Sequence, residues 1–329
     1  MARLGIKALA ALALGALLIG CAPGLPPAPP DTKPQARPNR PAAPVRAPEP
    51  PPAPSAESLE LARYYTRLET DLVAQGLLRT DGGGVDTPFT ATQLVRDFER
   101  IALADEYESG AGLRPASGAL GRVKKWTQPI RFDTEFGPAV PAEKRTRDRA
   151  ALERYVARLA RVTGHPMSFS AANPNFHVLF MSEDDRARLT SRIKSLVPGI
   201  DPATLAVLNR LPRSIHCLVI AFPERQGGYS YGKAIALIRS EHPELLTKTC
   251  IHEEIAQGLG LANDSPAARP SIFNDDDEFA LLTTHDELLL RMLYDARLSP
   301  GMDADEVRPI IREIAVELTE PDLATAGPS

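Results

Sequence analysis

The segment Cys250–Ser265, with the sequence CIHEEIAQGLGLANDS, carries the most informative spacing in this chain of 329 residues. Glu253 and Gln257 are four positions apart, so a helix places both side chains on one face. Gly260 then allows the helix to end sharply, and Asn263 follows in the returning turn. The spacing therefore predicts a helix whose last turn and following loop present polar side chains to one site.

The register of this motif starts at Glu253 and not at His252. Four residues after His252 stands Ala256, which leaves the imidazole without a partner on its helical face, so we interpret His252 as a structural histidine. When the pattern HExxHxxGxxH is started one residue later, Glu254 holds the place of the general base. The three ligand places then fall on Glu253, Gln257 and Asn263.

This spacing resembles the metzincin metallopeptidases, in their matrixin-like form. Ser271-Ile272-Phe273 stands where a Met-turn would lie. More narrowly, the chain resembles a family of bacterial lipoproteins of undetermined function that carry an EExxQ-type helix, an NDS step, a FNDDxEFALLT stretch and an HDELLLRMLYD helix, over about residues 120–302. The resemblance implies an α+β fold with a metzincin-like twisted sheet and an active-site-type helix, preceded by an N-terminal helical extension.

The ligand set departs from that of the resembled peptidases, because a carboxylate and two amides stand where they have histidines. Zinc favours imidazole, thiolate and carboxylate ligands, whereas amide oxygens suit harder ions. We therefore expect poor zinc affinity and a non-catalytic domain that acts in binding or structural support of the cell envelope. The alternative is a peptidase that uses zinc or another divalent ion and has Glu254 as its general base.

A metal-free use of Glu253 and Glu254 as an acid/base pair is a further alternative. Adjacent residues on a helix point about 100° apart, so we expect that the two carboxylates do not share one site. The neighbouring acidic run Asn274–Glu278 lacks the spacing and the glycine of an EF-hand, which favours a solvated loop over a calcium site. His285 is expected to cap or hydrogen-bond locally beside Thr284, the alternative being that it reaches the cleft.

The N-terminus has the pattern of a lipoprotein signal peptide over residues 1–20. Its apolar run is too short for a comfortable membrane span, and it leads to Leu18-Ile19-Gly20-Cys21, which resembles a bacterial lipobox. The resemblance implies cleavage before Cys21 and acylation of that cysteine, for example by palmitate. Ala22, in place of an aspartate, predicts outer-membrane anchoring with the domain facing the periplasm. An ordinary secretory peptide is the alternative.

Proline marks the boundary between anchor and domain. Of the 32 prolines, 14 lie in the 33 residues from 22 to 54, which predicts a semi-rigid polyproline II spacer, or alternatively a ligand for a partner module. The predicted organisation is a signal peptide (1–20), a lipidated cysteine and proline-rich linker (21–55), a helical extension (56–120), a metzincin-like domain (121–320) and a disordered tail (321–329).

Cysteine count and net charge add two constraints. With Cys21 assigned to lipid, Cys217 and Cys250 remain as an even pair in an oxidising compartment, which predicts a disulfide, with two reduced thiols as the alternative. A net charge of −4 lacks the excess of positive charge with which proteins bind nucleic acids, so nucleic acid is excluded as a general partner. The expected partners are the membrane, through Cys21, and an envelope protein.

Apolar periodicity predicts the elements of the domain. Helices are expected over 56–75, from 91 onward, over 147–163, near 184–196 and over 285–294. Strands are expected as a pair within 122–133, interrupted by Pro129, and over 176–181, 215–222 and 234–238, the last two joined by a turn at 226–229.

Overall fold

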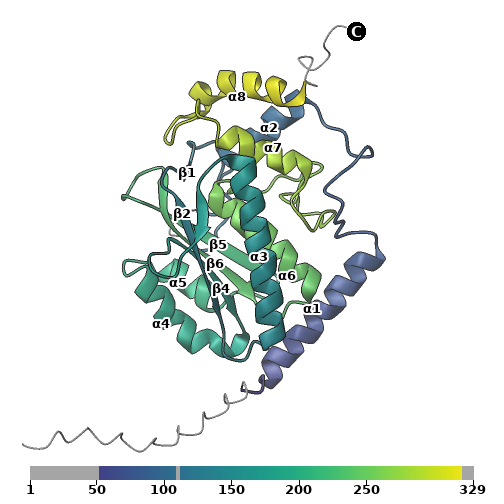
Figure 1. Cartoon of the computed structure of the whole chain (residues 1–329), viewed down its shortest axis with the longest axis vertical. Coiled ribbons are helices and arrows are strands. Elements are labelled where there is room, and N and C mark those ends of the chain that lie inside the picture. The colour runs from purple at the N-terminus through teal and green to yellow at the C-terminus, as the bar shows by residue number, and fades with distance from the viewer. Residues whose placement is uncertain (1–51, 109–111, 321–329) are drawn as a thin grey trace, which may run out of the picture. The chain divides into compact units, whose positions relative to one another are not determined.

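The computed structural model describes residues 52–108 and 112–320, which belong to one compact unit (Figure 1). The predicted signal peptide, Cys21, the linker up to residue 51 and the tail from 321 lie outside the described residues. Within the described part, no helix combines the length and the apolar character that a membrane span requires.

A mostly parallel sheet forms the centre of the fold. Four parallel strands lie side by side in the order β3 (Met167–Phe169), β2 (Ile130–Phe136), β4 (Phe176–Met181) and β6 (Ser230–Arg239). Strand β5 (Cys217–Pro223) runs antiparallel to β6 through the predicted turn, and the two-residue β1 (Lys125–Trp126) pairs with the start of β6. The expected α+β class is therefore corrected to a mixed α/β fold, because helices cross over between parallel strands.

Helices cover both faces of this sheet (Figure 1). On one face lie α3 (Ala142–Thr163) and α6 (Glu244–Leu259), whose apolar sides join the strands in the main core. On the other face, α4 (Arg186–Leu196) and α5 (Pro202–Asn209) form a second core with β4, β5 and β6, next to the short helix η1 (Glu183–Asp185). Because β4 is enclosed on both faces, its sequence FHVLFM is almost continuously apolar.

The remaining helices gather outside these layers. Helices α2 (Ala91–Ala102), α7 (Thr284–Leu293) and α8 (Ala304–Thr319) pack together at one end of the molecule (Figure 1). Helix α1 (Ala56–Ala74) contacts α6, and Glu69 accepts a hydrogen bond from the backbone N–H of Leu246, 2.9 Å away, in the first turn of α6. The N-terminal extension is thus joined to the helix that carries the motif.

Most predicted elements are confirmed, with three kinds of difference. The strand pair expected within 122–133 is wrong, because β1 pairs with β6 whereas β2 pairs with β3 and β4 on the far side of Pro129. Helix α3 begins five residues earlier than expected, at Ala142. Three elements were not predicted: β3, α5 and α8.

Candidate functional site: an acidic pocket beside helix α6

A pocket of about 290 Å³ lies between α6, the start of β5 and the loops that follow α6. Helix α6 contributes Glu253, Glu254 and Gln257, so the sequence motif does face a cavity. In the described residues, no lysine or arginine lines this pocket, and His216 is its one basic side chain. We call it the acidic pocket; its other acidic lining residues are Glu106, Asp264, Asp275 and Asp277.

Glu253 and Glu254 share this site, contrary to the expectation from their helical angle. A carboxylate oxygen from each lies within 4.8 Å of the other, because the long side chains converge on the pocket from adjacent positions. Glu254 is only 3% exposed, and its Oε2 has no hydrogen-bond partner among the described residues. Burial and the charge of Glu253 raise the pKa of Glu254 well above its usual value.

The structure brings Asp264, and not Asn263, to the pocket. The Asn263 amide donates to the carbonyls of Arg100 and Asp264, at 2.9 and 2.8 Å, so it is used in holding the turn. The Asp264 carboxylate lines the pocket 3.5 Å from the Gln257 amide nitrogen. Burial and the nearby Glu106 raise the pKa of Asp264 to about 7. The sequence signal for Asp264 was its position, one residue after the expected third ligand.

The donors of this site do not fit zinc. The one close set of donor atoms here joins Glu253 and Glu254 with the sulfur of Cys217, and that sulfur is bonded to Cys250. Two carboxylates remain, whereas catalytic zinc sites use three protein ligands drawn from imidazole, thiolate and carboxylate groups. We therefore derive no step that passes through a metal in this pocket.

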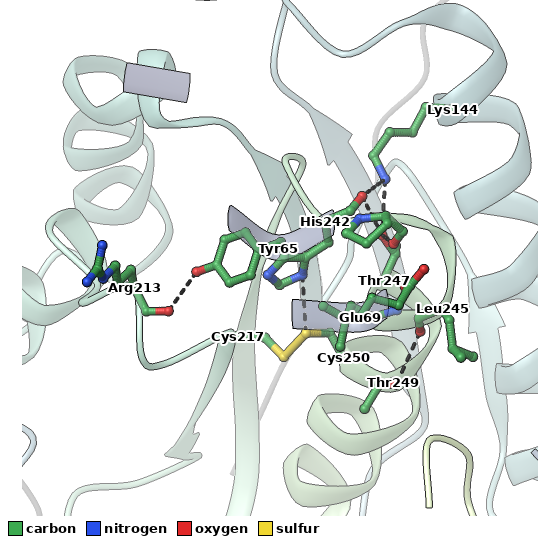
Figure 2. Close-up of a disulfide and its surroundings, with 12 residues drawn as sticks. Tyr65, Glu69, Lys144, Arg213, Cys217, His242, Leu245, Thr247, Thr249 and Cys250 are labelled. Carbon is green, nitrogen blue, oxygen red and sulfur yellow. Dashed lines mark hydrogen bonds between the residues drawn. A yellow bond between two sulfur atoms is a disulfide. The ribbon is translucent and has the colours of Figure 1, made fainter. Parts of the chain in front are cut away.

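The predicted disulfide between Cys217 and Cys250 is confirmed, with the two Cα atoms 5.8 Å apart (Figure 2). It joins the first residue of β5 to the middle of α6, two elements that line the acidic pocket. Beside it, Tyr65 of α1 packs edge-on against His242 and donates a hydrogen bond to the Arg213 carbonyl (Figure 2). Closing this loop stabilises the fold by about 3 to 4 kcal/mol in the chain-entropy description.

Gly260 ends α6 as predicted, and the reason is steric as well as conformational. Its φ is 126°, and a Cβ at this position would collide with the Lys124 carbonyl and the Leu293 side chain. The chain then returns through the turn at Ser271-Ile272-Phe273, where Ile272 lines the acidic pocket. The glycine thus brings the returning loop back against the helix.

Two histidines near the motif have structural roles. His252 accepts a hydrogen bond at Nδ1 from the Leu282 backbone N–H, 3.0 Å away, and stacks on Tyr155, which confirms its structural assignment. Burial lowers the pKa of His252 to about 3. His285 is fully buried with Nε2 3.2 Å from an Asp97 oxygen, and the residue that caps α7 is Thr283 instead of Thr284. His285 does not line the acidic pocket.

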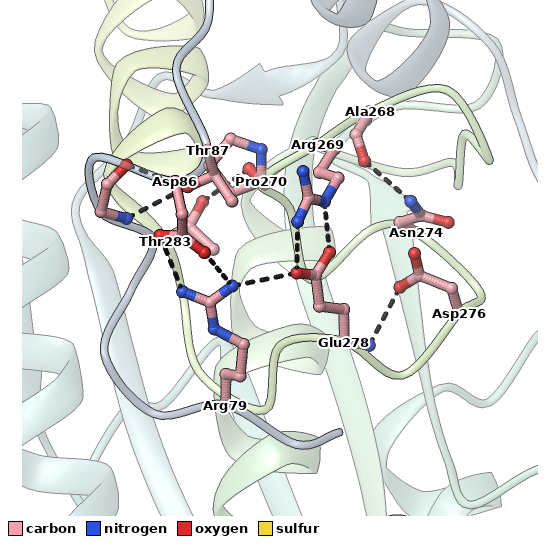
Figure 3. A network of polar contacts seen from close by, with 12 residues as sticks. Arg79, Asp86, Thr87, Ala268, Arg269, Pro270, Asn274, Asp276, Glu278 and Thr283 are labelled. Atoms are coloured by element: carbon pink, nitrogen blue, oxygen red, sulfur yellow. Dashed lines mark hydrogen bonds and ion pairs between the residues drawn. The ribbon is translucent and has the colours of Figure 1, made fainter. Parts of the chain in front are cut away.

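The acidic run Asn274–Glu278 is not simply solvated. Glu278 forms ion pairs with Arg269 and Arg79, as Figure 3 shows, and Asp276 accepts a hydrogen bond from the Glu278 backbone. Asp275 and Asp277 instead line the acidic pocket. The run therefore divides into side chains that hold the loop and side chains that add negative charge to the site.

A longer groove of about 540 Å³ runs along β5 and meets the acidic pocket. Residues 218–223 of β5 form one wall, and Glu106, Tyr107 and Gln257 line both cavities. Among the described strands, β5 pairs only with β6, so its second edge is not used by the sheet. The sequence did not predict this groove, because its walls come from segments far apart along the chain.

Comparisons with curated proteins and with solved structures find no match. A family match covers residues 91–313, which include every element from α2 to the middle of α8 and the whole acidic pocket. Because this match spans well over half of the chain, the protein belongs to the family described as "Protein of unknown function (DUF2927)".

Proposed function

We propose that this protein is an outer-membrane lipoprotein whose zincin-like domain is non-catalytic and binds an extended, basic segment of an envelope protein in the periplasm. The observation that carries this proposal is the continuity between the groove along β5 and the acidic pocket. The groove supplies a place for a peptide backbone, and the acidic pocket supplies a place for a basic side chain.

The edge of β5 suits an extended peptide. An unpaired strand edge presents backbone N–H and C=O groups, and a peptide that adds as a further strand satisfies them. Phe222 and Tyr229 line the groove beside β5 and offer apolar surface to the side chains of such a peptide. Affinity then comes from the backbone and the apolar contacts, and specificity from the pocket.

The acidic pocket suits a lysine or arginine side chain. Burial and mutual repulsion raise the pKa values of Glu253, Glu254 and Asp264. Ionising these carboxyl groups in the folded protein therefore costs free energy. A cation among them removes that cost, and buried pairs of this kind contribute strongly to binding. A metal ion is a weaker candidate because the close donor set loses its third atom to the disulfide.

The zincin-like assignment is supported by three features of the frame. Helix α6 follows β6 directly and packs against the sheet, Gly260 ends it with a return of the chain, and Ile272 in the turn at residues 271–273 lines the pocket. These are the relations that the metzincin resemblance implies. At the positions of the three metal ligands of the resembled peptidases, this chain has Glu253, Gln257 and Asn263. This replacement favours a binding function over hydrolysis.

The anchor rests on the sequence alone. Cys21→Ser is expected to release the protein from the outer-membrane fraction into the soluble periplasmic fraction. A protein that stays with the membrane after this change would contradict lipidation at Cys21. The two parts of the proposal are independent, because the binding test below uses soluble protein.

The binding test uses two labelled peptide pools that differ at one central position, Lys in the first and Gln in the second. Fluorescence anisotropy with the soluble Cys21→Ser chain is expected to show at least about tenfold tighter binding of the Lys pool. The double variant Glu253→Gln/Glu254→Gln should lose this preference, whereas the matched control Glu278→Gln should keep it. Equal affinity for both pools would overturn the proposal.

Hydrolysis by Glu253 and Glu254 is the second candidate, and their closeness favours it. Two carboxylates that share a site can hold one proton between them, which is the arrangement of an acid/base pair. If the bound peptides are cleaved, mass spectrometry will detect the products, and Glu254→Gln should abolish cleavage while binding persists. Stoichiometric metal in protein purified without chelators would instead favour the metal-dependent peptidase.

A further inference from the structure

A second group of potential ligands lies on the opposite side of the sheet from α6. Asp133 and Glu135 of β2 lie two residues apart on one face, and Asp133 is in register with His177 of β4. One ligand atom from each of the three side chains lies within 4.8 Å of the others. The alternate positions Phe132 and Phe136 pack in the main core, so this group faces the α4 side.

The imidazole of His177 is the unusual member of this group. It is only 3% exposed, and neither ring nitrogen forms a hydrogen bond with another described residue, although Nδ1 is fully covered. A buried polar ring without a partner carries a desolvation cost that a bound ligand would remove.

The two carboxylates are oriented but not fully used. Arg192 donates through both Nε and Nη2 to Oε1 of Glu135, which leaves Oε2 without a hydrogen bond. Asp133 accepts a hydrogen bond at Oδ1 from the Thr134 backbone N–H, 2.9 Å away, and its Oδ2 has no hydrogen bond to another described residue. Each carboxylate therefore has one oxygen that holds its orientation and one that is available to a ligand.

Each of the two nearby cations has a partner of its own. Arg192 pairs with Oε1 of Glu135, which is the role that hydrogen-bonded neighbours of ligating carboxylates have in metal sites. Lys233 is directed to the Leu196 carbonyl, 2.6 Å from its ammonium. Asp133 and Glu135 are half-buried, which leaves a route for an ion and for a water ligand.

We infer that Asp133, Glu135 and His177 form a binding site for a divalent transition-metal ion of the zinc class. One imidazole nitrogen and two carboxylate oxygens are three protein donors of the types that zinc accepts, and a water completes four-coordination. The site is separate from the acidic pocket, because the sheet lies between them. Its failure would leave the proposed function of that pocket untouched.

The test is a titration of the metal-free Cys21→Ser chain, carrying Glu253→Gln/Glu254→Gln, which removes the one close pair of carboxylates in the acidic pocket. Isothermal calorimetry with Zn²⁺ is expected to show one ion per chain, and Co²⁺ should give the visible absorption of a low-symmetry site. His177→Gln should weaken Zn²⁺ binding by more than about 100-fold, since even outer partners of metal ligands are worth 10- to 100-fold.

Matched variants make the result specific. His165→Gln removes a histidine that bonds the Gln128 carbonyl at the surface, and it should leave Zn²⁺ affinity unchanged. Asp133→Asn should weaken binding as His177→Gln does, and it serves in place of that variant should His177→Gln not fold. Absence of Zn²⁺ binding by the parent chain, or affinity unchanged by both ligand variants, would overturn the inference.

Discussion

Two groups of buried acids in this protein have opposite surroundings. Asp286 is fully buried at the start of α7, and it accepts hydrogen bonds from the Ser271 hydroxyl, the Ile272 N–H and both the N–H and hydroxyl of Thr283. His285 lies between it and Asp97. In the acidic pocket, Glu254 is almost as deeply buried, yet its Oε2 has no partner in the described part of the chain.

This difference separates acids that join segments of the fold by hydrogen bonds from acids that are buried with an oxygen left without a partner. A fully hydrogen-bonded buried carboxylate fixes the segments that donate to it, and here Asp286 joins the turn at residues 271–273 to α7. A buried carboxylate without a partner lowers stability, so its presence needs another reason. Variants of the two kinds of acid should therefore differ in their effect on stability.

The largest effect is expected for Asp286→Ala. Its loss leaves the Ile272 N–H and the Thr283 N–H buried without acceptors and removes a negative partner of His285, so the free energy of unfolding should fall by about 3 to 5 kcal/mol. Urea unfolding followed by circular dichroism measures this change. Asp276→Ala, which removes one exposed loop contact, should cost well under about 1 kcal/mol. Similar losses for both variants would contradict the contrast.

Reduction of the Cys217–Cys250 bond is expected to have the next largest effect. The double variant Cys217→Ser/Cys250→Ser should lower the free energy of unfolding by about 3 to 4 kcal/mol, because the unfolded chain gains the freedom that the cross-link removes. It should also weaken selection between the Lys and Gln peptide pools, since β5 and α6 both line the acidic pocket. Stability equal to that of the oxidised protein would show that the bond does not constrain the chain.

The pH dependence of stability distinguishes the two acid groups. The pKa of Asp264 rises from 3.8 to about 7, so its contribution is greatest below pH 4 and is lost as pH rises toward 7. Burial opposes the charge of His285, but Asp286 and Asp97 outweigh it and raise its pKa from 6.5 to about 9, so that contribution is lost between pH 6.5 and 9. Stability should therefore fall from pH 5 to pH 7 by about 2 kcal/mol for Asp264 alone.

Asp264→Asn isolates the lower part of this profile. The variant should flatten the dependence of unfolding free energy between pH 4 and pH 7 and leave the loss between pH 7 and pH 9 in place. Urea midpoints measured across this range give both slopes. An unchanged slope below pH 7 would mean that folding does not raise the pKa of Asp264.

The smallest effect is expected for Glu254→Gln, and its sign is the informative part. The change should raise the free energy of unfolding at pH 8, because burial and the charge of Glu253 raise the pKa of Glu254 and so make its ionisation in the folded state unfavourable. Glu278→Gln makes the same chemical change in a carboxylate paired with Arg79 and Arg269, and it should lower stability. Destabilisation by Glu254→Gln would place Glu254 among the structural acids.

Local signals predicted much of the fold. Thr90 forms the capping box that starts α2, Gly164 ends α3 with a φ of 65°, and β4 has the bounds that its apolar run indicated. Elements were missed where local signals are weak. Helix α8 contains an internal proline, Pro309, and a proline in a helix interior weakens the local helical signal.

The candidate site was predicted in part. The i, i+4 spacing of Glu253 and Gln257 indicated that both lie on one helical face, and both line the acidic pocket. The convergence of Glu254 with Glu253 was not predicted, because it depends on how the two long side chains bend toward the pocket. The spacing failed for Asn263 and Asp264, because the direction of each side chain in the returning turn depends on the contact with Arg100 of α2. The group of Asp133, Glu135 and His177 was not predicted, since strand register is decided between segments distant in sequence.

The sequence by itself determined the elements of short range: the helix of the motif, its glycine end, the capping residues and the even pair of cysteines. Only the tertiary structure decided which acids are paired, because burial and hydrogen-bond partners come from segments about two hundred residues apart. Asp286 is therefore fully hydrogen-bonded, whereas Asp264, of the same residue type, lines the acidic pocket with a raised pKa. The sequence determines which residues are acidic, whereas the fold determines how deeply each acid is buried and which groups hydrogen-bond to it.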